Sequence, residues 1–228
     1  MVLGNLSRRT WNWLWRFKHR KGYGVHSPSD FYLISFVIYE DHPFYAYSKL
    51  KEIRPYVDHL PHYREKIDRL LFRLINYLQP DSIIEIGTGS GLEALYMSSA
   101  KQCDIYTFDD GKKIPEVKQL LEIHSNIVYR TGETEKLLHE FLQHIPLSGV
   151  VHIGHTPFYK EIFETLVPHV MTKTCFIIAS PYASKQKKRW WKEIIKDTRT
   201  GVTFDLYDIG IVFFDKKRVK EHRIVDFF

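Results

Sequence analysis

The residues with the clearest capacity for chemistry lie in a glycine-rich run at positions 85–91, which reads Glu-Ile-Gly-Thr-Gly-Ser-Gly. Glycines let a backbone approach a ligand closely, and the free N–H groups at the start of a following helix attract an anion. A dinucleotide-binding fingerprint would require a further glycine at position 92, and that residue is Leu92. The run therefore predicts a ligand-binding turn of a different kind, or an ordinary glycine-rich turn.

Carboxylates that could bind a ribose follow the next apolar segment. Tyr106, Thr107 and Phe108 lead directly into Asp109 and Asp110. An acid at the tip of the strand after a glycine-rich loop can accept hydrogen bonds from both ribose hydroxyls, as in nucleotide-binding α/β folds. The expected register of the strand favours Asp109 as the residue that binds the ribose, with Asp110 as the alternative. A solvated turn acid is the ordinary explanation for either residue.

These side chains need a sheet that brings strand ends together, and the second part of the chain has that pattern. From Asp81 onward, short apolar segments alternate with helical ones, which predicts a parallel sheet with helices on both faces. The expected strands are 82–86, 104–108, 126–130, 150–153 and 174–179. Two last strands, 202–207 and 210–214, are joined so tightly that only an antiparallel hairpin is permitted. We expect an α/β fold with a seven-stranded, mostly parallel sheet and an antiparallel last strand.

The first 80 residues lack this alternation and have helical patterning. Residues 3–20 and 62–78 are expected to form helices. Ser27 and Pro28 suit the cap and the first position of another helix, which would run to about Glu40. We therefore divide the chain into a helical extension, residues 1–80, and a sheet domain with the glycine run, residues 81–228.

The pattern Glu-x-Gly-x-Gly-x-Gly resembles motif I of class I S-adenosylmethionine (SAM) methyltransferases, and the five β/α units closed by a hairpin resemble their Rossmann-like fold. The resemblance implies SAM as the cofactor and methyl transfer as the activity. It places the adenine beside Gly132 and Glu133, although Glu133 equally suits a helix N-terminus. The cofactor-binding residues that it implies are Glu85, Gly87, Thr88, Gly89, Gly91, Asp109, Gly132 and Glu133.

Segments of the extension narrow the resemblance. Gly-Val-His-Ser-Pro at 24–28 and Pro-Phe-Tyr-Ala-Tyr at 43–47 resemble a group of Bacteroidetes O-methyltransferase-like proteins with a helical N-terminal extension. A nucleic-acid amino-methyltransferase would carry Asn/Asp-Pro-Pro-aromatic after the fourth strand, where this chain reads His-Thr-Pro-Phe at 155–158. We therefore expect O-methyl transfer to a small-molecule or lipid-linked acceptor, and no nucleic-acid substrate.

Related metal-dependent O-methyltransferases hold a divalent metal with carboxylates after the fourth and fifth strands. The corresponding positions here are Ile153, Ala179 and Ser180, which lack the carboxylates of a hard-metal site. We expect no metal, and a reaction that needs positioning and a base. His155, just after the fourth strand, is one candidate base. His26, in the glycine-flanked loop, is the other, although a loop histidine is more often structural or merely exposed.

The missing carboxylates leave a second hypothesis open. The chain could bind SAM, or descend from a protein that did, without turnover, and act as a membrane-associated or interaction module. Discrimination between the two hypotheses requires a measurement of SAM binding and of turnover.

Charge is concentrated at the N-terminus. The chain has 33 Lys and Arg against 27 Asp and Glu, a net charge of +6, and residues 1–24 hold six cations, three tryptophans and no acid. We expect a helix over residues 1–21 that contacts anionic lipid at the inner face of the membrane, or that packs against the chain's own extension or a second subunit of a homodimer. The longest apolar run, Phe31–Tyr39, is too short to span a bilayer, and early arginines interrupt any secretory signal. With two cysteines, a cytoplasmic setting is the expectation.

Overall fold

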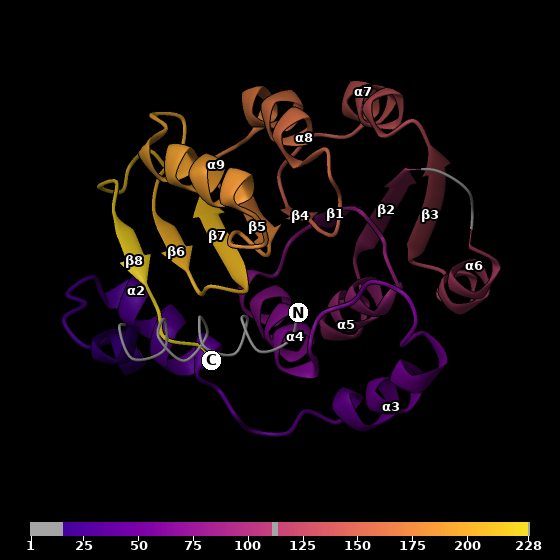
Figure 1. The fold of residues 1–228 in the computed structure, drawn as a ribbon, viewed down its shortest axis with the longest axis horizontal. Helices are drawn as coiled ribbons and strands as arrows, with labels where there is room; N and C mark the ends of the chain where they lie inside the picture. Colours follow the sequence, from indigo (N-terminus) through magenta and orange to yellow (C-terminus); the bar gives the residue numbers. More distant parts are fainter. Residues whose placement is uncertain (1–15, 111–113, 228) are drawn as a thin grey trace.

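An eight-stranded sheet forms the centre of the computed structural model, which describes residues 16–110 and 114–227 (Figure 1). The strand order is β3-β2-β1-β4-β5-β7-β6-β8. The strands are β1 (Ser82–Ile86), β2 (Asp104–Asp110), β3 (Ile127–Gly132), β4 (Val150–Ile153), β5 (Cys175–Ala179), β6 (Thr203–Asp205), β7 (Ile209–Phe213) and β8 (His222–Ile224).

Strand direction follows the sequence-based expectation. The strands from β3 to β5 pair in parallel, and β7 is antiparallel to both of its neighbours, β5 and β6. The predicted α/β fold is therefore confirmed, with one difference. The sheet has an eighth strand, β8, which pairs in parallel with β6. Three residues are too few to show a strand period, so β8 has no local sequence signal.

Helices cover both faces of the sheet (Figure 1). One layer holds α4 (Glu65–Leu78), α5 (Leu92–Ala100) and α6 (Pro115–Glu122), and the other holds α7 (Thr134–His144), α8 (Tyr159–Leu166) and α9 (Lys185–Lys196). The amphipathic pattern of α4 explains its position, because Ile67, Leu70, Leu71 and Leu74 are all buried. Each face of the sheet has its own apolar core.

The extension is made of short helical pieces. They are η1 (Phe17–Gly22), α2 (Pro28–Tyr32), the π-helix η2 (Leu33–Ile38), α3 (Ala46–Ile53) and η3 (Arg54–Tyr56). Ser27 caps α2 as expected, with its hydroxyl accepting from the Asp30 N–H at 3.4 Å. Most of the helix predicted over residues 3–20 lies outside the described residues. From Phe17 the chain is a 3-10 helix, and it leaves helical geometry at Arg20 and Lys21.

Buried ion pairs attach the extension to the far strands. Arg16 contacts Asp205 of β6 at 2.7 Å, and both side chains are almost fully buried. Asp30 in α2 pairs with Arg218 and with Arg223 of β8. The apolar core under α4 also includes side chains of η2, so the extension and the sheet share one core. The domain boundary at residue 80 stays a prediction.

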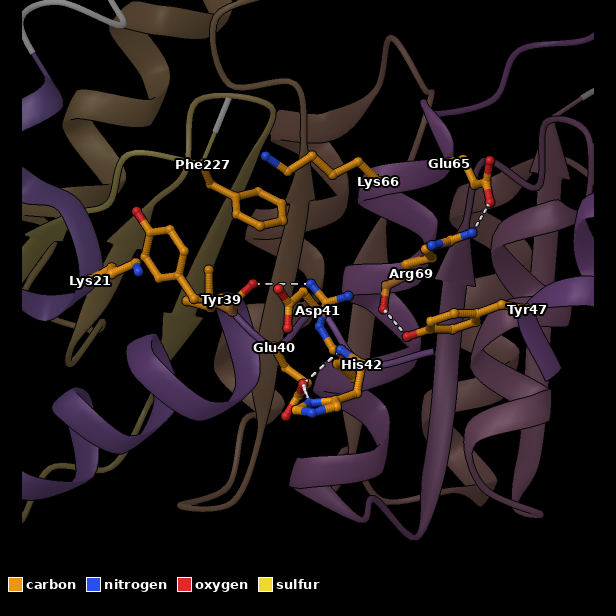
Figure 2. Close-up of a pocket in the computed structure, with 12 residues that line it drawn as sticks. Lys21, Tyr39, Glu40, Asp41, His42, Tyr47, Glu65, Lys66, Arg69 and Phe227 are labelled. Atoms are coloured by element: carbon orange, nitrogen blue, oxygen red, sulfur yellow. Dashed lines mark hydrogen bonds and ion pairs between the residues drawn. The ribbon is translucent and has the colours of Figure 1, made fainter. Parts of the chain in front are cut away.

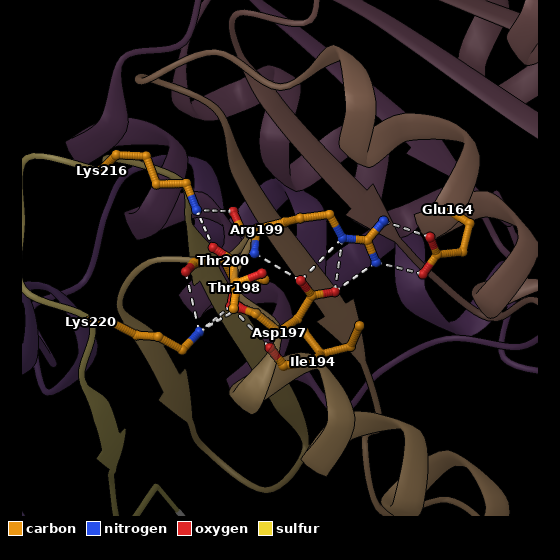
Figure 3. A network of polar contacts seen from close by, with 8 residues as sticks. All are labelled: Glu164, Ile194, Asp197, Thr198, Arg199, Thr200, Lys216 and Lys220. Atoms are coloured by element: carbon orange, nitrogen blue, oxygen red, sulfur yellow. Dashed lines mark hydrogen bonds and ion pairs between the residues drawn. The ribbon is translucent and has the colours of Figure 1, made fainter.

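A second polar network lies at the surface near the end of α9 (Figure 3). The Arg199 guanidinium donates to both Asp197 and Glu164, which joins the loop after α9 to α8. Lys220 donates to the Asp197 carbonyl at 2.7 Å. None of the helices in the described part of the chain has the length and apolarity that a membrane crossing needs.

Candidate functional site

The glycine run forms the loop between β1 and α5, and two other segments enclose it. A Cβ on Gly89 would lie 2.5 Å from the carbonyl oxygen of Pro61, and one on Gly87 would lie 3.0 Å from the backbone nitrogen of His155. Both residues also have positive φ, at 54° and 88°. The Ser90 N–H donates to the Pro61 carbonyl at 2.9 Å. Glycine is therefore required at 87 and 89 because backbone from before α4 and after β4 packs against the loop.

Glu85 lies beneath this loop and is fully buried. Its register partners are Thr107 on β2 and His152 on β4. The Thr107 hydroxyl donates to Glu85 Oε2 at 2.6 Å, and His152 Nδ1 lies 3.0 Å from Glu85 Oε1. Thr88 is also buried, with its hydroxyl 2.6 Å from that of Thr107. Burial raises the pKa of Glu85 to about 8, so this carboxyl holds its proton at neutral pH.

A chain of polar contacts continues from Glu85 to two residues that the sequence did not single out, Tyr63 and Glu93. The Tyr63 hydroxyl lies 3.1 Å from His152 Nε2, and the Tyr63 N–H donates to Glu93 Oε1 at 3.2 Å. Glu93 is 1% exposed, and burial together with the charge of Glu85 raises its pKa to about 7. Burial lowers the pKa of His152 to about 4, so its ring is neutral.

Only Glu93 could have been noticed from the sequence, as an acid in the first turn of the helix that follows the glycine loop. Nothing local marks Tyr63, because it precedes β1 by 19 residues and reaches the site through the packing of the extension.

His155, the first candidate base, lies directly beside this cluster. Its backbone packs on Gly87, and its ring centroid is 4.7 Å from that of Tyr63. Nε2 is buried 3.8 Å from Glu93 Oε1 without a hydrogen-bond partner, while the whole side chain is 26% exposed. The exposed part therefore belongs to other atoms. Burial lowers the pKa of His155 to about 4, so the ring is neutral at pH 7 and is a weaker base than a free imidazole.

His26, the second candidate base, lies in a different part of the molecule. It is exposed in the segment before α2, and α2 is attached to β8 through the ion pair between Asp30 and Arg223. His155 follows β4, which is four positions from β8 in the sheet. The structure does not bring the two histidines together, because loop position depends on the packing of the extension, which the sequence alone does not specify.

The ribose candidates end β2. Asp109 lies on the same face as Thr107 and Glu85, and Asp110 points to the opposite face. Asp109 is half-buried, and burial raises the pKa of its carboxyl. Asp110 instead lines a cavity of about 200 Å³ together with Glu133, Thr134 and Phe158.

The loop after β3 borders the same cavity. Gly132 pairs with Asp110, and Glu133 immediately precedes α7. The Glu133 side chain is 59% exposed and pairs with Lys136 at 2.6 Å. This is the position of a helix N-terminal acid that also faces a cavity, so both interpretations of Glu133 remain open.

Two of the residues at the positions of the metal ligands are apolar and buried, and the third lies in a tight turn. Ile153 and Ala179 are fully buried. Ser180 has a φ of 43° and donates its N–H to the Asp208 carbonyl at 2.7 Å. Metal-independence of the chemistry stays a prediction.

Another cavity lies elsewhere, on the outer face of α4 (Figure 2). It has a volume of about 560 Å³, and several of its charged groups already have partners within the chain. Arg69 pairs with Glu65 and stacks on Tyr47, while Lys66 lies 4.1 Å from the ring of Phe227. This cavity is separated from the sheet by α4, so it is not part of the glycine-loop site.

Comparison with solved structures shows the same fold in methyltransferases. An O-methyltransferase from Bacillus cereus in complex with S-adenosylhomocysteine (SAH) matches with TM-score 0.59 and 16% identity, over 82% of this chain and 97% of that chain. The O-methyltransferase TomG from Streptomyces achromogenes, in complex with SAM, matches with TM-score 0.58 and 16% identity, over 82% and 95%. The SAH-bound methyltransferase PaMTH1 from Podospora anserina matches with TM-score 0.60 and 12% identity, over 83% and 96%.

No family model and no curated protein matches the chain in sequence. At these identities the structural matches establish a shared fold, the Rossmann-like fold of class I SAM-dependent methyltransferases. The fold class inferred from the sequence is thereby confirmed. The narrower resemblance to the Bacteroidetes group stays a prediction.

Proposed function

We propose that the protein is a SAM-dependent methyltransferase that transfers a methyl group to an oxygen of a small-molecule or lipid-linked acceptor without a metal ion. One observation carries the proposal. The glycine loop lies at the carboxyl end of β1, and β1 and β4 flank the point where the strand order reverses. In open α/β sheets that crevice is where ligands bind. His155, a neutral histidine, lies on the other side of the same crevice.

The residues at the carboxyl ends of β1 and β2 fit SAM. The loop of residues 87–91 has three glycines and lies at the carboxyl end of β1, and α5 begins directly after it, so the start of a helix is available to an anionic group. Asp109 offers a half-buried carboxylate to the ribose, and the cavity beside Asp110 and Glu133 offers an enclosed space near the adenine end. Bound SAM would supply an electrophilic methyl group. The protein would orient the acceptor, exclude water and remove a proton from its hydroxyl.

Calorimetric titration with SAM tests the cofactor assignment. Asp109→Ala removes two charge-assisted hydrogen bonds to the ribose, each worth about 1.5 kcal/mol or more, so we expect at least a roughly tenfold weaker affinity. Asp110→Ala is the matched control, with affinity close to that of the wild type. A loss in Asp110→Ala alone would move the ribose contact to that residue. Unchanged affinity in both variants contradicts the assignment.

Transfer of a labelled methyl group to a panel of hydroxylated acceptors tests the chemistry. A general base contributes about a hundredfold or more, so His155→Ala should lose turnover by that amount and keep its SAM affinity. His26→Ala serves as the comparison, because His26 precedes α2, which is attached to the edge strand β8, four positions from β4. Turnover should persist in EDTA. Complete loss in EDTA, restored by Mg²⁺, would contradict metal independence, and SAM binding without any turnover would favour the interaction-module hypothesis.

We also propose a cytoplasmic location with peripheral contact to anionic membrane through the N-terminal region, of which residues 1–15 lie outside the described part. The described end of this region supports the proposal, because Tyr23 and Phe36 are 85% and 57% exposed and Lys21 lies two residues before Tyr23. Aromatic and basic side chains together suit the headgroup layer. Salt-sensitive co-sedimentation with phosphatidylserine vesicles, weakened in Tyr23→Ser and Phe36→Ser, is expected. A dimer in sedimentation velocity that buries this face, with no vesicle binding, contradicts it.

A further inference from the structure

Two carboxyl groups are buried beneath the glycine loop without a lysine or arginine partner. Glu85 and Glu93 are 0% and 1% exposed. Within residues 16–110 and 114–227, the basic groups within ion-pair distance of them are the imidazoles of His152 and His155. Their hydrogen-bond donors are otherwise uncharged, and include the Thr107 hydroxyl and the Tyr63 N–H. A buried carboxylate without a counter-ion is costly, so such a group keeps its proton instead.

The two groups act as a pair, which we call the Glu85–Glu93 pair. Each has its pKa raised mainly by burial, to about 8 for Glu85 and about 7 for Glu93, and the charge of Glu85 further raises the pKa of Glu93. The pair therefore retains at least one proton below pH 7.

Other charged groups around the pair do not replace a counter-ion. Tyr63, His152 and His155 are uncharged at neutral pH. Burial is the main cause of the raised pKa of Glu85, with a smaller contribution from Asp109 on β2, and burial followed by the charge of Glu93 raises the pKa of Asp68 on α4. Burial is the main cause that lowers the pKa of both histidines, the charge of Lys187 on α9 adds to it, and in the described part of the chain Lys187 makes no ion pair with either carboxyl group of the pair. The cluster therefore lacks a positive charge that a ligand could supply.

We propose that the Glu85–Glu93 pair releases a proton when a cationic cofactor binds at the glycine loop, so that the site distinguishes SAM from its uncharged-sulfur product SAH. The inference rests on the proposed function. SAM and SAH share the same amino-acid and nucleoside parts, and they differ by the methyl group and the positive charge on sulfur. A positive charge next to the loop favours the ionised form of a nearby carboxyl group. SAH brings no such charge, so the pair stays protonated when SAH is bound.

The same pair takes up the proton that the acceptor hydroxyl loses during methyl transfer. During methyl transfer the acceptor O–H bond breaks, an O–C bond forms, and the S–C bond breaks with its electron pair remaining on sulfur. His155 accepts the proton at Nδ1 and releases the proton on Nε2 to the ionised pair, which requires the 3.8 Å separation between Nε2 and Glu93 Oε1 to shorten to hydrogen-bond distance. The protein is then back in its protonated state with SAH bound. The steps balance without a further reactant.

Titration calorimetry of the wild-type protein tests the proposal directly. SAM and SAH are each titrated at pH 6.5, where α-amino groups with pKa values of about 7.7 to 8.0 stay charged, in phosphate and in imidazole buffer. The difference in heat between the buffers gives the number of protons released. We expect SAM to release about one proton more than SAH, and the dissociation constant of SAM to tighten up to about tenfold from pH 6 to pH 7. Equal proton numbers for the two ligands overturn the proposal.

A variant identifies the groups responsible. Glu93→Gln keeps the shape and removes one titrating group, so the excess proton release with SAM should fall by at least about half, and the preference for SAM over SAH should shrink. Glu140→Gln, an exposed residue on α7, is the matched control and should behave as the wild type. An unchanged proton excess in folded Glu93→Gln overturns the role of the pair. If Glu93→Gln does not fold, the wild-type comparison decides. Failure of both ligands to bind contradicts the proposed function rather than this inference.

Discussion

The buried carboxyl groups of this protein fall into two sets, and their partners differ. Asp30 and Asp205 are almost completely buried, and each contacts at least one arginine. Asp68 also contacts an arginine, Arg54, but burial still raises its pKa well above its usual range, so it stands between the two sets. Glu85 and Glu93 are buried to the same degree, and they contact hydroxyls, amides and neutral imidazoles. The first set lies between the extension and the C-terminal strands, whereas the second lies beneath the glycine loop.

The difference separates a structural use of charge from a functional one. A buried carboxylate with an arginine is compensated within the chain, and it fixes how two segments pack. A buried carboxyl group without a cation is left in its protonated form, and it can respond to a charge brought from outside. The arginine-paired set should therefore control stability, and the glycine-loop set should control pH dependence and ligand binding.

The largest expected effect comes from breaking an arginine pair. Arg16→Met leaves the Asp205 carboxylate buried without its counter-ion, which should lower the free energy of unfolding by about 3 to 5 kcal/mol. Arg199→Met is the control, because Arg199 makes more hydrogen bonds with Glu164 and Asp197 but is 44% exposed (Figure 3). Its loss should cost about 1 kcal/mol or less. Denaturant unfolding measures both.

A larger loss for Arg199→Met than for Arg16→Met would contradict the division between the two sets. It would mean that the number of hydrogen bonds, rather than burial of the charge, determines the stability of these contacts.

A smaller effect is expected at the glycine loop itself. Gly89→Ala places a Cβ against the Pro61 carbonyl and keeps a positive φ, which should cost about 2 to 3 kcal/mol and weaken SAM binding. Gly24→Ala is the matched control, since Gly24 has a φ of 76° and open space around it. Gly24→Ala should lower the free energy of unfolding only by the cost of a positive φ in a residue with a side chain, about 1 kcal/mol. Equal losses in thermal unfolding would show that Pro61 does not constrain the loop.

The sequence predicted the parts of the fold and site that depend on local pattern. The alternation from residue 82 specified the parallel strands, and the spacing of Glu85 with the three glycines specified the loop, because a strand, a turn and a helix follow each other there within ten residues.

Features that depend on distant contacts could not be predicted. Tyr63 reaches His152 across 89 residues of chain, and Arg16 reaches Asp205 across 189. Strand β8 is defined only by its pairing with β6. The position of His26 depends in the same way on how α2 packs against the C-terminal strands.

The smallest effect concerns the pH dependence of stability. Glu85 and Glu93 ionise near pH 4.5 when unfolded but only near pH 8 and 7 when folded, so the folded state binds more protons between those values. His152 and His155, with a folded pKa of about 4, contribute an opposite slope only below their ordinary pKa of 6.5. Stability should therefore fall from pH 6.5 to pH 8, by about 1.4 kcal/mol per pH unit for each retained proton.

Glu85→Gln should reduce this slope, because the amide that replaces the carboxyl group does not titrate. Urea unfolding of the wild type and the variant at half-unit pH intervals measures it. A wild-type stability that rises over this range would show that the carboxyl groups are ionised in the folded protein, contrary to the comparison between the two sets.

A crystal structure of the protein with SAH tests the central claim most directly, since it locates the ligand among the cavities of the molecule. The account predicts SAH along the carboxyl ends of β1 and β2, against the Gly87–Gly91 loop, with its ribose on Asp109 and its sulfur on the side of His155. SAH in the cavity on the outer face of α4 (Figure 2), or SAH without contact to the Gly87–Gly91 loop, would contradict it.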